Sequence, residues 1–230
     1  MKPGENEMPD NGMAEEESRM NPGSERRLKR AAEIISVVFH PIFMPLYGLL
    51  IIYSAHTLHS FLPSQIKRMI LILVMANNLL LPMAFATFLY ARGSIRTFNA
   101  SDRNERVLLL SFVLMMYSLT AFILLRMQVP TLFRAFFISI AIVTFTILLI
   151  TIFYRISLHA SGIGGLVVLV ICMTTVYNIG MLWQSVAVAL IAGAVMSSRI
   201  YLGDHTPTEV WTGVAAGAVM MGLSLFFMLR

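Results

Sequence analysis

The sequence predicts an all-α, polytopic membrane protein: a helical bundle of about six to seven transmembrane helices. Of its 230 residues, 57% are hydrophobic and 13% are charged, and the mean hydropathy is +0.77. Eight of the twelve acidic residues lie within the first 33 positions, and the other four fall in two short segments. Apolar runs long enough to cross a hydrocarbon core of about 30 Å recur along the rest of the chain. This composition excludes an ordinary soluble domain.

Residues 1–33 are predicted to form a disordered polar tail, and residues 34–230 a single transmembrane domain. The tail is rich in Pro, Gly, Asn and Glu and lacks apolar periodicity. Its last part is positively charged, which favours a cytoplasmic N-terminus; the residues are Arg26, Arg27, Lys29 and Arg30. The net charge of +5 is modest, and the basic residues flank apolar runs, which favours membrane anchoring over nucleic-acid binding. The single cysteine, Cys172, excludes an intrachain disulfide.

The first two spans are predicted at residues 34–55 and 69–90. Pro41 and Pro45 indicate a kink or a late helix start in the first span. His40 directly precedes Pro41, and it is either a site residue or an interfacial histidine bonded to the backbone. Two amides within the second span are predicted to bridge helices or to contact a substrate: Asn77 and Asn78.

Five further spans follow, and three polar islands lie before or between them. The spans are predicted at residues 107–125, 133–154, 163–177, 181–197 and 207–229. The islands are residues 91–106, 155–162 and 198–209. Two spans precede the first island, and two separate each island from the next. The N-terminal tail and all three islands are therefore expected on one face of the membrane.

The third island, SRIYLGDHTPTE, concentrates ionisable residues at membrane depth, where charge is costly and marks a functional site. Thr206 is predicted as the N-cap of a helix with Pro207 at its first position and Glu209 at N3, the pattern of a capping box. His205 would then lie just before a helix N-terminus, which favours anions. Together with Arg199, this arrangement suggests a phosphate site.

Ser198-Arg199, five residues, His205, three residues and Glu209 resemble the third signature of the type 2 phosphatidic acid phosphatase family, which ends in Asp where this chain has Glu209. The resemblance implies that Arg199 binds phosphate and that His205 is the nucleophile that becomes phosphohistidine. It also implies that Glu209 orients His205. A capping role explains an acid at this position equally well.

The family's other two signatures are present in degenerate form. The first, Lys, six residues and Arg-Pro, resembles either Arg96 with Arg103 or Asn99 with Arg106, and we favour Arg106 as the phosphate ligand. The second, Pro-Ser-Gly-His, resembles residues 156–159 at two positions, which implies that Ser157 contacts phosphate and that His159 is the general acid for the leaving group. A structural histidine hydrogen-bonded at a helix start is the alternative for His159.

The resemblance implies a metal-independent phosphatase without a cofactor, acting on a lipid-anchored phosphate or pyrophosphate. Undecaprenyl pyrophosphate, phosphatidylglycerol phosphate and lipid A phosphates are the substrates it suggests. We expect an integral protein of the bacterial inner (cytoplasmic) membrane, with its N-terminus and site on the same face. One alternative is a non-catalytic lipid-phosphate binder or transporter that retains the site. Another is an intramembrane serine protease that pairs Ser161 with His205.

Overall fold

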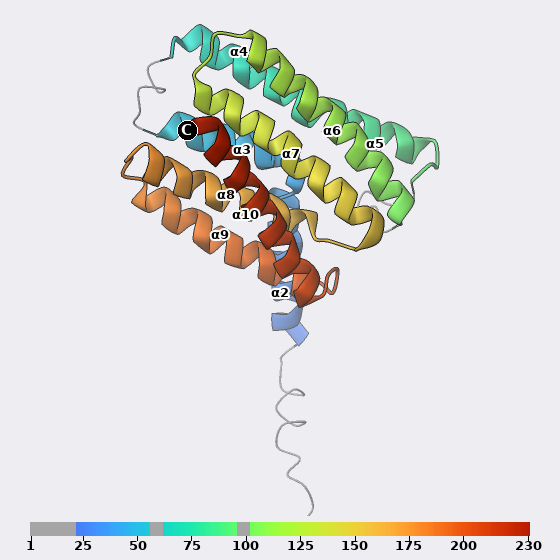
Figure 1. Ribbon diagram of the computed structural model, residues 1–230. Coiled ribbons are helices and arrows are strands. Elements are labelled where there is room, and N and C mark those ends of the chain that lie inside the picture. Colours follow the sequence, from blue (N-terminus) through green and yellow to red (C-terminus); the bar gives the residue numbers. More distant parts are fainter. Residues whose placement is uncertain (1–21, 56–61, 96–101) are drawn as a thin grey trace, which may run out of the picture.

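The computed structural model describes residues 22–55, 62–95 and 102–230, and these residues form helices without β-strands. Within them, seven helical stretches are long and apolar enough to cross a membrane. Figure 1 shows the helices α6, α7, α10 and α8 running side by side, while α2 projects from one end of the bundle. The expectation of an all-α bundle with about seven spans is confirmed.

The first span is broken where its prolines predicted a kink. Helix α2 (Pro22–Val38) is followed by a short 3-10 turn, η1 (Pro41–Phe43), and by α3 (Met44–Ser54). Helix α2 begins at Pro22, twelve residues before the expected start of the first span near residue 34. The extra turns are rich in Arg, Lys, Glu and Ala, which are strong helix formers even when exposed.

The second span also contains an irregular segment. Helix α4 (Ser64–Val74) passes through a π-helical turn, η3 (Met75–Leu80), into α5 (Leu81–Ala91). Pro82 lies in the first turn of α5 and cannot donate to the preceding turn, which accounts for the irregular hydrogen bonding there. The side-chain oxygen Oδ1 of buried Asn78 accepts a 2.6 Å hydrogen bond from the Thr120 hydroxyl of α6. The prediction that this amide bridges helices is confirmed.

Five regular helices complete the bundle: α6 (Arg103–Arg126), α7 (Thr131–Phe153), α8 (Leu158–Val176), α9 (Leu182–Tyr201) and α10 (Pro207–Leu229). Helices α8 and α9 are longer than the predicted spans at residues 163–177 and 181–197. Both continue into the polar islands: Ser157 caps the start of α8, and Ser198 and Arg199 are buried at the end of α9. His159 and Arg199 therefore lie inside helices rather than in loops.

Helices α8 and α10 share the most extensive contact in the bundle. Glycines make this close approach possible: a Cβ at Gly164 would lie 2.6 Å from the Val214 carbonyl oxygen, and one at Gly217 would overlap that of Ser161. The backbone N–H of Ser157 also donates to the Glu209 carbonyl oxygen at 3.3 Å. The N-terminal ends of α8 and α10 are thereby held side by side.

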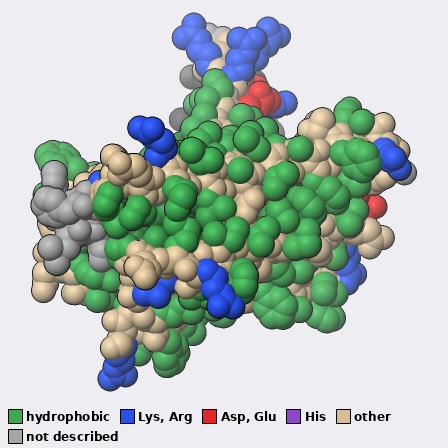
Figure 2. All heavy atoms as spheres, turned by 90° about the horizontal axis from the view of Figure 1, so that it is seen from above, with side chains coloured by type: hydrophobic (Ala, Val, Ile, Leu, Met, Phe, Trp, Pro, Cys, Tyr) green, Lys and Arg blue, Asp and Glu red, His purple; other side chains and the backbone are tan. Residues whose placement is uncertain are grey.

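The outer surface is apolar, as expected for helices that face lipid. Figure 2 shows a broad face covered by hydrophobic side chains, with Lys and Arg mainly near its margins. Large exposed side chains include Phe153, Trp183 and Phe227, which are 88%, 81% and 75% exposed. Surface of this kind is stable in a bilayer and costly in water. The seven apolar helices and this surface are compatible with an integral membrane protein.

Candidate active site

One cavity of about 970 Å³ opens among the helix ends that carry the polar islands. All three islands contribute to its lining, together with the first span. The charged and histidine side chains of the lining are Lys29, Glu33, His40, Arg106, Arg155, His159, Arg199, Asp204 and His205. Residues of the three islands, up to 99 positions apart along the chain between Arg106 and His205, therefore meet in one space, while their shared membrane face stays a prediction.

His205 and Glu209 form the most tightly defined pair of the site. The Nδ1 of His205 lies 2.8 Å from the Oε2 of Glu209. An ionised carboxylate can only accept hydrogen bonds, so Nδ1 carries the proton and Nε2 keeps a free lone pair. The Oε2 of Glu209 also accepts a hydrogen bond from the Thr206 backbone N–H at 3.2 Å. In return, the Thr206 hydroxyl oxygen accepts one from the Glu209 backbone N–H at 3.3 Å. Glu209 therefore completes a capping box and orients His205 at the same time.

Burial keeps the His205 ring neutral. It lowers the pKa of His205 below its ordinary value of 6.5, while the hydrogen bond to Glu209 raises the pKa part of the way back. The positive charge of Arg199 lowers it further. The unprotonated ring, with Nε2 free, is therefore the form present at neutral pH.

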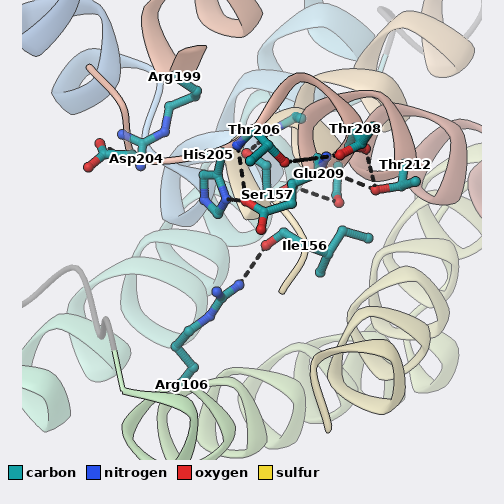
Figure 3. A network of polar contacts seen from close by, with 12 residues as sticks. Arg106, Ile156, Ser157, Arg199, Asp204, His205, Thr206, Thr208, Glu209 and Thr212 are labelled. Atoms are coloured by element: carbon teal, nitrogen blue, oxygen red, sulfur yellow. Dashed lines mark hydrogen bonds and ion pairs between the residues drawn. The ribbon is translucent and has the colours of Figure 1, made fainter. Parts of the chain in front are cut away.

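Arg199 is buried, yet part of its guanidinium is unoccupied. Its Nη2 forms a 2.9 Å ion pair with Asp204, and its Nη1 donates to the Ser36 hydroxyl at 3.3 Å. Its Nε is buried and has no hydrogen-bond partner among the described residues. Figure 3 shows the Arg199–Asp204 pair on one side of His205 and Glu209 on the other. A buried donor without a partner costs about 1–3 kcal/mol.

The structure separates the two arginines that the first signature left open. Arg106 is 6% exposed, lines the main cavity and donates from Nη2 to the Ile156 carbonyl oxygen at 2.6 Å. Arg103 is exposed and faces a neighbouring pocket of only about 110 Å³. The structure brings Arg106, and not Arg103, to the site. Arg96 and Asn99 lie outside the described residues.

The second signature contributes one cavity residue. His159 lines the cavity, and its Nε2 lies 3.0 Å from the Ser36 carbonyl oxygen. Because a carbonyl only accepts, Nε2 is the protonated nitrogen, and Nδ1 is the position left for proton transfer. Ser157 is fully buried and caps α8, accepting the Ala160 N–H at 3.5 Å. Its expected contact with phosphate has no support, because the hydroxyl serves the helix end.

Among the cavity residues outside the three signatures, Arg155 and His40 lie close to the signature residues. Arg155 borders the site two residues before Ser157, and its charge acts on both Arg106 and Arg199. A basic residue directly following an apolar span was its signal. His40 comes from the first span, and only its position before a proline drew attention to it.

The site offers anion-binding groups rather than a metal-ligand cluster. Among the described residues, no group of three or more His, Cys, Asp or Glu side chains is placed to hold a metal ion. The chain matches no protein-family model, no curated protein and no solved structure. Any function must therefore be argued from the residues of the site.

Proposed function

We propose that this protein is a membrane phosphatase that hydrolyses a lipid-anchored phosphate or pyrophosphate through a phosphohistidine intermediate. The observation that carries the proposal is the His205–Glu209 pair, because it leaves a neutral Nε2 free beside a cavity lined by buried arginines. A nucleophile with its proton fixed on the other nitrogen, next to cationic anion ligands, suits phosphoryl transfer.

In the first step, the Nε2 of His205 attacks phosphorus and the bond to the lipid oxygen breaks. Arg199 and Arg106 hold the phosphoryl oxygens with charge-assisted hydrogen bonds. The departing oxygen takes a proton from the Nδ1 of His159, whose protonated form is favoured by the negative charge of the bound substrate. The new phosphohistidine carries positive charge on its ring, which the Glu209 carboxylate stabilises through Nδ1–H.

In the second step, His159 is neutral and its Nδ1 accepts a proton from water. The resulting hydroxide attacks phosphorus, the P–N bond breaks and inorganic phosphate leaves. His205 regains its free Nε2, and His159 is again protonated for the next cycle. General acid–base catalysis of this kind contributes on the order of 10²–10⁴-fold.

The shape of the cavity supports a substrate with an apolar chain. Below Arg106, the lining continues along one stripe of α6 through Leu110 and Val113 to Tyr117. The eleven-position step from Arg106 to Tyr117 corresponds to about 16 Å along the helix. On α7 the matching stripe consists of Phe136, Ile140, Val143 and Ile147. A headgroup at the polar end would therefore place its hydrocarbon chain along an apolar slot.

A second candidate is a lipid-phosphate binder or transporter without turnover. It is favoured by the partners that the cations already have, since Arg199 pairs with Asp204 and Arg106 holds the Ile156 carbonyl. The protease alternative has less support. The Ser161 hydroxyl donates to the Ser157 carbonyl oxygen at 3.0 Å, and no hydrogen bond joins it to His205 within the described part of the chain.

The test is phosphate release by detergent-purified protein from a panel of lipid phosphates and pyrophosphates, with a chelator present. We expect release that disappears in His205→Ala while phosphate binding remains. Acid-labile, base-stable labelling by a ³²P-phosphorylated substrate would identify the phosphohistidine. Binding of the lipids without release by the wild-type protein would overturn hydrolysis and favour the binder.

A further inference from the structure

His40 reaches the site from the first span, which shares no motif with the phosphatase signatures. It is the N-cap of the η1 turn and lines the same cavity as His159, Arg199 and His205. The sequence left its role open between a site residue and a backbone-bonded histidine. The structure shows the backbone bond, and it also fixes what the other side of the ring can do.

The backbone determines which nitrogen of His40 carries the proton. The Ile42 N–H donates to the Nδ1 of His40 at 3.3 Å, so Nδ1 is an acceptor. In a neutral imidazole only one nitrogen carries a hydrogen, and in His40 this must be Nε2. His40 thus has a single N–H donor, on the edge of the ring away from its cap.

The same helix end also positions His159. Pro41 has no N–H to give to the Val37 carbonyl, and the His40 N–H bonds there instead, at 3.3 Å. The Ser36 carbonyl, which His40 would have capped in a regular helix, is left for the Nε2 of His159 at 3.0 Å. The break at Pro41 therefore creates both the cap that fixes His40 and the acceptor that fixes His159.

The two rings are in direct contact, edge to face, with centroids 5.3 Å apart. Two imidazolium ions at this separation, near the cationic Arg199, would repel each other strongly. When His159 is protonated for its role as acid, His40 is therefore the ring that remains neutral. A neutral ring that keeps its proton can stabilise charge by hydrogen bonding without exchanging protons with the substrate.

We propose that His40 is a further catalytic residue, whose Nε2–H donates to a non-bridging phosphoryl oxygen beside the leaving group. The inference rests on the proposed phosphatase function and adds a donor from a span outside the signatures. No bond to His40 forms or breaks, and its proton stays on Nε2. Loss of one preorganised donor of this kind lowers kcat by about 10²–10³-fold.

Two substitutions separate the donor role from the capping role. His40→Gln places an amide N–H near the position of Nε2, but it is a poor N-cap. His40→Asn supplies an N-cap acceptor for the Ile42 N–H, but its side chain is too short to reach the Nε2 position. We expect His40→Gln to stay within about tenfold of wild-type kcat/KM, and His40→Asn to lose about 10²–10³-fold with its Tm retained. Wild-type activity in His40→Asn, or equal loss in both variants, would overturn the proposal.

Binding of orthovanadate, measured as the shift in Tm on titration, provides a readout that does not require turnover. We expect His40→Asn to bind vanadate at least about tenfold more weakly than His40→Gln, and equal affinities would overturn the donor role. A wild-type protein that binds vanadate but releases no phosphate would refute the phosphatase function. In that case, the difference in vanadate affinity between the two variants would still test whether His40 is an anion donor. If the wild-type protein is active and both His40 variants keep its kcat/KM and its affinity for vanadate, only the role of His40 is refuted.

Discussion

Replacing Glu209 with Gln tests how the site activates its nucleophile. Gln keeps the size of the side chain and an oxygen that can accept the Thr206 N–H, so the start of α10 remains capped. It removes the negative charge 2.8 Å from the Nδ1 of His205. That charge fixes the tautomer of His205 and opposes the positive charge that develops on the ring when Nε2 bonds to phosphorus.

The size of the effect follows from this geometry. At about 4 Å between charge centres and an effective dielectric constant near 20, the interaction is worth about 4 kcal/mol, and about 2 kcal/mol with more screening. A loss of about 2–4 kcal/mol corresponds to a fall of about 30- to 1,000-fold in kcat. The free energy of unfolding should change by less than about 0.5 kcal/mol, because the helix cap survives the substitution.

The pH dependence of kcat/KM gives a second, signed readout. Neutral His205 is the reactive form, so activity falls as pH drops through its pKa, which burial holds below 6.5. Glu209 raises the pKa of His205, and Glu209→Gln must therefore move the acid limb to lower pH. Thr206→Ala is the control: it removes the cap acceptor at a cost of about 1 kcal/mol and should leave the limb in place. A wild-type kcat in Glu209→Gln, or an acid limb of its pH profile that moves to higher pH, would contradict this role of Glu209.

Three further substitutions test the phosphate ligands, the slot and the helix contact. Arg106→Ala should lower kcat/KM by about 10–10²-fold through the lost charge-assisted bonds, whereas exposed Arg103→Ala should not; equal losses would reject this assignment. Gly48→Ala places a Cβ against the Phe136 ring at the deep end of the slot, so the optimum chain length in a lipid phosphate series should shorten, and an unchanged optimum would contradict the slot. Gly217→Ala meets a backbone carbonyl of α8 and should cost about 1–3 kcal/mol of stability, visible as a lower Tm together with lost activity.

The sequence alone determined the class of fold and predicted which residues form the candidate site. Apolar runs and polar islands alternate so regularly that about seven apolar helices follow from counting, and the same count predicts one shared face for the islands. The His205–Glu209 pair was also predictable, because its members lie four positions apart and a helix start fixes their relation. Local spacing carries such information, since it depends only on helix geometry.

Only the tertiary structure decided which distant residues join that pair. His159 and Ser36 are 123 positions apart, and no local pattern encodes their contact. Which of Arg106 and Arg103 faces the cavity depends on which side of α6 packs against the neighbouring helices. The hydroxyl of buried Ser157 caps α8, which the sequence did not indicate. Glycine contacts between α8 and α10 and the break at Pro41 set these relations, because close packing leaves each side chain few positions to occupy.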